Sequence, residues 1–278
     1  MKALLYIDGV DVYNEYGVSV SDLAYDDLVC FPELKPIEFN DWHEQNGIDP
    51  DLSAPVVKER DISIPFNVAG VHSGYEAFIS KLTDGAYHTF NFVGLGLTRV
   101  LRLKSCGTIK SVLGLGLFTL VFSDDAPRNE VEYESPSSII AKYGDYLLDG
   151  IDFANYGIRF LRGTMDSITQ KPDVKENLKR DISVVDGLIY DGKNVTYKSR
   201  TAKLRCLMRA GSAEEFWKNW NALFADLVKP GHRILYVAEL DKEIPCFYKG
   251  CSVNCFFPDR GKFWFEFTLS LEFFKGLI

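Results

Sequence analysis

The chain has 278 residues and a formal net charge of −8, with 46% hydrophobic and 25% charged residues. This length suits two domains of ordinary size, and the composition is typical of a soluble globular protein. The acidic balance argues against broad nucleic-acid binding, which needs a basic face. The longest nearly apolar run, residues 112–122, is too short for a membrane helix, and no secretory signal is predicted.

The first predicted elements are two short strands joined by a tight turn. A strand over residues 3–7 leads into Asp8-Gly9, a pair that tolerates the positive backbone angles of a hairpin. A second strand is expected through Tyr16-Gly17-Val18. The polar, proline-bearing segment 21–57 that follows is predicted to be a loop without a continuous helix. Such long loops are usually functional or become ordered on a partner. We therefore expect this loop and its counterpart at 163–197 to mediate assembly rather than catalysis, and residues 40–52 to be dispensable for folding.

An alternating strand, a helix and three more strands complete the first half. Ile62, Ile64 and Phe66 alternate with polar residues, which predicts a strand with one buried face. The capping-box residues Ser73 and Glu76 predict a helix that ends before Gly85. The helix is expected over 73–84 and the three strands over 87–93, 98–105 and 115–122.

The same elements recur in the second half, at an offset of about 140 residues. They comprise a strand at 146–148, a loop at 163–197, a helix at 212–229 and strands at 233–239, 245–256 and 263–273. Trp217 and Trp220 lie on a broad apolar face of this helix, which we interpret as core packing against a sheet rather than a stacking platform for bases or sugars. Several local matches keep the same order in both halves: Asp8-Gly9 with Asp149-Gly150, Tyr16-Gly17 with Tyr156-Gly157, Lys35-Pro36 with Lys171-Pro172, Asn46-Gly47 with Asp186-Gly187, Lys58 and Arg60 with Lys198 and Arg200, Ser73 and Glu76 with Ser212 and Glu215, Lys104 and Cys106 with Lys249 and Cys251, and Phe118–Leu120 with Phe267–Leu269.

This ordered repeat predicts two copies of one domain, because a unit of this length exceeds the repeats of a solenoid. We expect an α+β, mainly β fold: two tandem antiparallel β-sandwich or barrel-like domains, each with one covering α-helix. The predicted divisions are a first domain at 1–123, a connector at 124–145 and a second domain at 146–278. Part of the connector, 138–143, is expected to be helical. The two halves are therefore expected to share one strand order.

No motif for catalysis or metal binding is present. The histidines are scattered, and neither a zinc-protease His spacing nor a nucleophile-elbow Gly-x-Ser-x-Gly occurs; they are His43, His72, His88 and His232. The pairs Asp26-Asp27 and Asp124-Asp125 are interpreted as solvated turn residues. The cysteines lack the close spacing of zinc sites and are interpreted as buried thiols of a reduced compartment; they are Cys30, Cys106, Cys206, Cys246, Cys251 and Cys255. We therefore predict a protein that is not an enzyme, with no catalytic, cofactor-binding or metal site.

The order of elements resembles the tube-type domain of bacteriophage tail proteins, especially the N-terminal domain of distal tail proteins. The resemblance is carried by the opening Asp8-Gly9, the Arg-headed strand Arg60–Phe66, the single helix, and the strands Thr89–Phe92, Arg99–Leu103 and Leu117–Phe122. It covers most of both halves and rests on patterning. Many distal tail proteins carry an unrelated C-terminal domain where this chain repeats the first, whereas hub proteins of contractile tails also contain paired tube-like domains.

The resemblance implies a structural protein of a phage or prophage-derived virion tail, in the distal tail or baseplate hub, assembled in the bacterial cytoplasm. Its expected partners are further copies of itself in a ring, either a trimer with pseudo-sixfold symmetry or a hexamer, and the neighbouring tail tube and tip proteins. No membrane and no sequence-specific nucleic acid are expected. Two alternatives stay open: a carbohydrate- or protein-binding β-sandwich module that uses an exposed aromatic such as Trp42, and an enzyme whose site includes Asp124.

Overall fold

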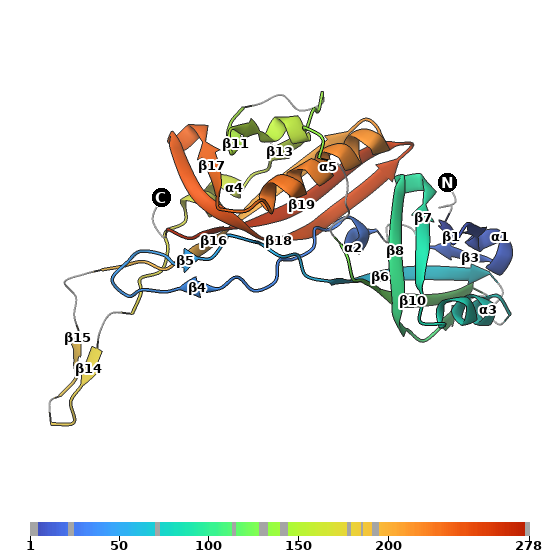
Figure 1. Cartoon of the computed structure of the whole chain (residues 1–278), viewed down its shortest axis with the longest axis horizontal. Helices are drawn as coiled ribbons and strands as arrows, with labels where there is room; N and C mark the ends of the chain where they lie inside the picture. Colours follow the sequence, from blue (N-terminus) through green and yellow to red (C-terminus); the bar gives the residue numbers. More distant parts are fainter. Residues whose placement is uncertain are drawn as a thin grey trace.

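The computed structural model describes residues 5–21, 25–69, 73–112, 115–127, 133–139, 144–176, 179–184, 186–190 and 195–275. The described chain is mainly β and divides into two halves with similar elements (Figure 1). The first half contains β1 Leu5–Ile7, β2 Val10–Asp11, α1 Val12–Tyr16, β3 Val18–Val20, α2 Asp26–Val29, β4 Phe39–Asn40, β5 Asp49–Pro50, β6 Arg60–Ala69, α3 Ser73–Leu82, β7 Tyr87–Phe92, the 3₁₀ turn η1 Val93–Leu95, β8 Leu97–Cys106, β9 Lys110–Val112 and β10 Leu115–Asp124.

The second half repeats this list with one strand fewer among the described residues. It contains β11 Tyr146–Leu148, β12 Ile151–Asp152, the 3₁₀ turn η2 Phe153–Tyr156, β13 Ile158–Phe160, α4 Thr164–Thr169, β14 Lys179–Asp181, β15 Leu188–Tyr190, β16 Arg200–Ala210, α5 Ala213–Leu227, β17 Arg233–Val237, the 3₁₀ turn η3 Ala238–Leu240, β18 Lys242–Asp259 and β19 Lys262–Phe273.

Each half has one main sheet, and the strand order is the same in both. The first sheet runs β2-β1-β7-β8-β10-β6-β3, with β9 added beside β10, and the second runs β12-β11-β17-β18-β19-β16-β13. Every pairing along both paths is antiparallel. The predicted common strand order and the mainly β, antiparallel class are confirmed. Each main sheet is one continuous path of strands.

The opening turn is built identically in the two halves. Asp8 and Asp149 have positive φ values of 51° and 49°, and the glycine after each is also left-handed. Each Asp side chain accepts a backbone N–H from the strand alongside, that of Thr89 or Ile234, at 2.9 and 2.7 Å. The second strand predicted after this turn is interrupted, because Asp11 caps α1 with its side chain and Asp152 caps η2.

The predicted alternation of the central strands is confirmed by burial. Ile62, Ile64 and Phe66 of β6 are fully buried, while Asp61 and Ser63 are exposed. In β19 all six alternating apolar residues from Phe263 to Phe273 are buried. One helix lies against each sheet, α3 in the first half and α5 in the second (Figure 1). The Ser212 side chain accepts from the Glu215 N–H, which confirms the predicted cap of α5.

The long loops contain short elements that the sequence pattern did not predict. Helix α2 and the strand pair β4–β5 lie in 21–57, and α4 and the pair β14–β15 lie in 163–197. The residues predicted to be helical in the connector are not so at Ser138 and Ile139, and 140–143 lie outside the described residues.

Candidate assembly interface

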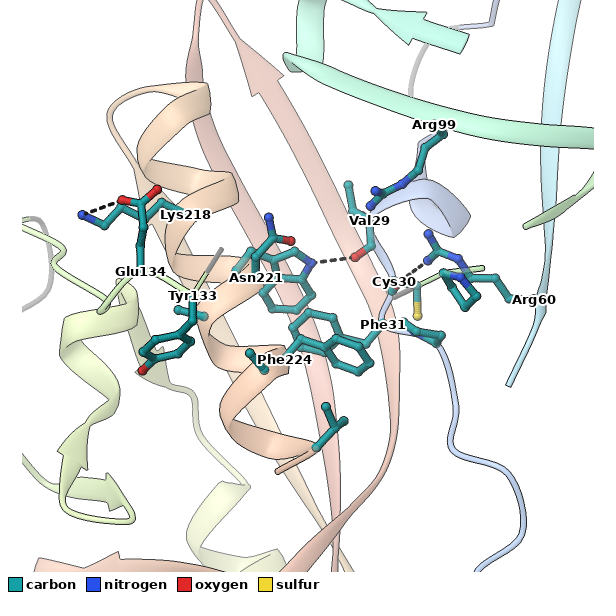
Figure 2. A pocket seen from close by; sticks show the side chains of 16 residues that line it. Val29, Cys30, Phe31, Arg60, Arg99, Tyr133, Glu134, Lys218, Asn221 and Phe224 are labelled. Atoms are coloured by element: carbon teal, nitrogen blue, oxygen red, sulfur yellow. Dashed lines mark hydrogen bonds and ion pairs between the residues drawn. The ribbon is translucent and has the colours of Figure 1, made fainter. Parts of the chain in front are cut away.

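The two halves meet at a seam where the first long loop packs on helix α5 and strand β18. Phe31, which follows α2, stacks on Trp220 with ring centroids 3.6 Å apart and an interplanar angle of 14°. It also stacks on Phe224 and meets Tyr248 edge to face. Phe31, Trp220 and Phe224 line a pocket of about 230 Å³ at this seam. Figure 2 labels Phe31 and Phe224 there. Burial of such aromatic surface is the main stabilising contribution at a contact of this kind.

Hydrogen bonds from ring and phenol donors hold the first loop to the second half. Trp220 Nε1 donates to the Val29 carbonyl at 2.8 Å, and the Tyr248 hydroxyl donates to the Pro32 carbonyl at 3.0 Å. Trp217 Nε1 donates to the Leu95 carbonyl at 2.6 Å, which joins α5 to the end of the first sheet. The core-packing interpretation of the tryptophans is right for Trp220, which is 2% exposed, and Trp217 is half-buried at the seam.

Two arginines, Arg60 and Arg99, line the pocket at this seam. Arg60 Nε is 3.0 Å from Asp124 Oδ2, and its Nη1 donates to the carbonyl of Asp27 within α2 and to that of Cys30 at the C-cap. Arg200 donates in the same way to the carbonyls of Ser167 and Ile168 in α4. The repeated arginine therefore secures the short helix that follows the third strand of each half, since these carbonyls have no partner within the helix.

Arg99 is the less well satisfied of the pair at the seam. Burial lowers its pKa to about 10, the positive charge of Arg60 acts in the same direction, and Asp124 opposes both. Its guanidinium carbon is 5.9 Å from the centroid of the Trp217 ring, and its buried Nε has no hydrogen-bond partner. It contributes a desolvated positive charge to the side of the pocket (Figure 2).

In a second contact, the tip of the first loop (residues 41–47) packs on Lys175 and Tyr197 at the base of the second loop. The Lys175 ammonium is buried, with 4% of its side chain exposed, and donates to Asp41 Oδ1 at 2.5 Å and to the carbonyls of Trp42 and Gly47 at 2.8 and 2.5 Å. The Gly47 N–H donates to the Tyr197 carbonyl at 2.7 Å. The first loop is thus engaged within its own chain, which counts against the predicted removal of residues 40–52; its role in assembly stays a prediction.

The carboxylates that the sequence singled out are structural, and one interpretation is corrected. Asp124 is 4% exposed and paired with Arg60, so it is not a solvated turn residue. Asp125 accepts from Arg102, Tyr87 and Ser123. Asp27 accepts the Ser63 N–H at 3.0 Å, although it is exposed as predicted. Asp124 was missed because the pairing partner, Arg60, lies on another strand.

The histidines, Trp42 and the cysteines are dispersed. His88 is buried between Asp8 and Asp84, and His72 lies outside the described residues. Trp42 is 53% exposed and offers its carbonyl, not its ring, to Lys175. Cys206 and Cys246 are buried as predicted, but Cys106 is exposed. Within the described ranges no three His, Cys, Asp or Glu side chains gather closely enough to hold a metal ion.

Oxidation of the folded chain with diamide is expected to join Cys30 to Cys251 across the seam. The Cys30 thiol donates to the Cys251 carbonyl at 3.2 Å. A hydrogen bond with the Cys251 side chain lowers the pKa of Cys30, assisted by the charge of Arg60, whereas burial raises the pKa of Cys251, so Cys30 is the thiol that reacts first. A lowered thiol pKa raises the thiolate fraction that forms disulfides. Peptide mapping by mass spectrometry checks the link, with Cys30→Ser as the control. Oxidation that leaves both thiols free, while exposed Cys106 reacts, would contradict the described seam.

None of the helices among the described residues is long and apolar enough to cross a membrane. No protein-family model and no curated protein matches the chain. Among solved structures it is similar to the SPP1 Dit protein, whose crystal structure is described as a paradigm of the hub adsorption apparatus in phages that infect Gram-positive bacteria. The similarity covers 97% of this chain and 97% of that chain, with 11% sequence identity and a TM-score of 0.33.

Proposed function

We propose that the chain is a ring-forming structural component of a phage or prophage-derived tail, of the distal tail or baseplate hub type, that joins the tail tube to the tip. One observation carries the proposal. The loop of the first half packs on the second half, so two similar units are joined head to tail within one chain. The sequence resemblance to tube-type tail domains supports the location.

A head-to-tail contact leaves an unused surface at each end of the chain. The second half has a loop like the one that the first half uses, and the first half has a base like the one that receives it. Such a heterologous contact, repeated from unit to unit, gives a closed ring when the rotations between successive units return to the first unit. Otherwise it gives an open filament. A ring around a channel is the arrangement that the tube-domain resemblance implies.

Each half, in this proposal, is one tube-like domain whose curved sheet and helix form a sandwich or barrel-like wall. The divisions are those expected from the sequence, 1–123 and 146–278 with a connector at 124–145. Three chains would then place six domains in a pseudo-sixfold ring, and six chains would place twelve. The differences between the two halves favour three, because contacts within and between chains then alternate and are free to differ.

The proposal places the protein in the virion tail, after assembly in the bacterial cytoplasm, in contact with tail tube and tip proteins. Its role there is structural, without catalysis and without a cofactor. The seam supports this use of the fold, because its aromatic and backbone contacts hold two domains in one orientation. A fixed orientation between successive units is what determines whether a ring closes.

Sedimentation velocity over a range of concentrations, followed by electron microscopy, tests the proposal. The expected result is a concentration-dependent assembly that appears as rings with a central channel, and detection of the chain in purified tails by mass spectrometry. Rings of three chains would establish the pseudo-sixfold trimer, and rings of six would overturn that stoichiometry. A chain that stays monomeric at all concentrations and is missing from tails would contradict the proposed function.

A further inference from the structure

The two strand pairs of the long loops, β4–β5 (39–50) and β14–β15 (179–190), are called the first and second arms. The residues around the bridges Leu34–Val57 and Val174–Tyr197 are called their bases. The second arm repeats the first with the same register. The pair β4–β5 sets Phe39 opposite Pro50, and β14–β15 sets Lys179 opposite Tyr190, a constant step of 140 residues. The bridges at the bases follow the same step, with Leu34 opposite Val57 and Val174 opposite Tyr197. The two arms and the two bases are thus equivalent residue by residue.

This register identifies which residues in the second arm correspond to the clamped tip. The residues equivalent to Asp41, Asn46 and Gly47 are Asp181, Asp186 and Gly187. Both glycines are left-handed, with φ of 73° and 86°. The sequence match of Asn46-Gly47 with Asp186-Gly187 is therefore confirmed at the level of backbone conformation.

The same register assigns a counterpart to the clamping lysine. The Lys35 N–H donates to the Val56 carbonyl and the Lys175 N–H to the Thr196 carbonyl, both at 2.8 Å, so Lys35 is the equivalent of Lys175. The match of Lys35-Pro36 with Lys171-Pro172 is wrong, because strand register, which local similarity does not reveal, decides equivalence. The Lys175 side chain is buried against the arm that it clamps, whereas Lys35 is exposed and makes no ion pair with a described residue.

The two glycines differ in what surrounds them. A Cβ on Gly47 would lie 1.7 Å from the carbonyl oxygen of Phe274, so the tip of the first arm needs glycine for close approach. A Cβ on Gly187 would meet nothing within 4 Å. The second arm extends away from both sheets (Figure 1) and exposes apolar side chains, with Val184 87%, Leu188 51%, Ile189 53% and Tyr190 48% exposed. Such a group of exposed apolar residues marks an interaction surface.

We propose that the arm 179–190 docks on the base of the first half of a second copy of this chain, at residues 33–35 and 56–58, and that Lys35 of that copy clamps it. The Lys35 ammonium would form an ion pair with the Asp181 carboxylate and donate to the carbonyls of Ile182 and Gly187. These contacts correspond to those of Lys175 with Asp41, Trp42 and Gly47 within the chain. The inference rests on the proposed ring, of which it names the contact between chains. The second copy is the occupant because the arm lies away from the base of its own chain (Figure 1).

The contact within the chain and the proposed contact between chains differ in detail. Thr196 donates its hydroxyl to the His43 carbonyl at 2.7 Å in the clamp within the chain. The residue equivalent to Thr196 is Val56, 52% exposed, and Val184 replaces the glutamate that is its equivalent in the first arm. Val56 has no hydroxyl to donate to the carbonyl of Ser183, the residue equivalent to His43, so the contact between chains lacks this hydrogen bond.

Reversing one charge at a time in the full-length chain tests the clamp. Lys35→Glu and Asp181→Lys are each expected to weaken self-association at least tenfold in sedimentation velocity, since each places like charges together. The double variant Lys35→Glu/Asp181→Lys is expected to recover association, because every contact then regains opposite charges. The matched controls Lys262→Glu and Asp259→Lys change exposed charges on the β18–β19 turn and are expected to assemble like the unmodified chain.

Mixing the two single variants counts the chains. A Lys35→Glu chain can only contact an Asp181→Lys chain, so the two alternate around the assembly. An alternating ring closes with an even number of chains and cannot close with three. Closed rings from the mixture therefore indicate six chains, and open pairs that do not close indicate three.

The outcomes separate the clamp from the proposed function. Rings that form normally from both single variants would overturn the clamp and leave the ring in place. Loss of assembly in the single variants without recovery in the double variant would also overturn it. Unmodified chains that never self-associate and are missing from purified tails would overturn the clamp together with the proposed function.

Discussion

Replacing Trp220 with alanine is expected to lower the free energy of unfolding by about 3–5 kcal/mol, the usual cost of truncating a buried aromatic. The ring is 2% exposed and packs edge to face on Phe265 and Phe267 while it stacks on Phe31 of the other half. Its removal also leaves the Val29 carbonyl without the Nε1 donor. Urea denaturation followed by circular dichroism measures the change.

Trp42→Ala is the matched control, because the same side chain is removed from a site where it is 53% exposed. Its effect on stability is expected to be much smaller than that of Trp220→Ala. Equal effects from the two substitutions would contradict the packing of the seam. Phe31→Ala should behave like Trp220→Ala, since the two rings stack on each other.

Replacing Lys175 with methionine is expected to lower the free energy of unfolding by about 2–3 kcal/mol. Methionine retains the apolar length of the side chain and removes the charge, so the carbonyls of Trp42 and Gly47 lose their donor. Hydrogen bonds to a charged group contribute about 1.5–3 kcal/mol each. The net loss is smaller than their sum, because methionine no longer buries an ammonium and the half-exposed Asp41 is hydrated instead. Thermal and urea unfolding of the full-length chain check the value.

Lys35→Met is the control at the equivalent position of the first half, where the side chain is exposed. It is expected to leave the stability of the monomer unchanged. A loss of stability as large as that of Lys175→Met would show that Lys35 is engaged within its own chain, contrary to the structure. The pair of variants therefore compares one clamp that is occupied within the chain with one that is available to a partner.

The seam explains why the first long loop belongs to the fold. Its first part supplies Phe31 to an aromatic cluster of the second half, and its tip supplies the acceptors for Lys175. Ordering so long a loop costs conformational entropy, which these buried contacts offset. The second loop has the same form but extends its arm beyond both sheets (Figure 1), where we propose that it contacts a second copy.

The sequence by itself determined the elements whose signals are local. Alternation at Ile62, Ile64 and Phe66 indicated a strand with one buried face because successive side chains of a strand point to opposite faces. The cap at Ser212 indicated where α5 begins because its bond spans three residues. The Asp-Gly turns and the order of matches indicated two copies of one fold, and the common strand order follows from that repetition.

Only the tertiary structure decided which parts of the two copies touch. Trp220 and Val29 are 191 residues apart, and Lys175 and Asp41 are 134 apart, so no local pattern relates them. Strand register showed that the residue equivalent to Lys35 is Lys175 and not Lys171. Asp124, predicted to be a solvated turn residue, forms a buried ion pair with Arg60. Local propensities depend on neighbours in the chain, whereas burial and charge pairing depend on neighbours in space, which folding alone brings together.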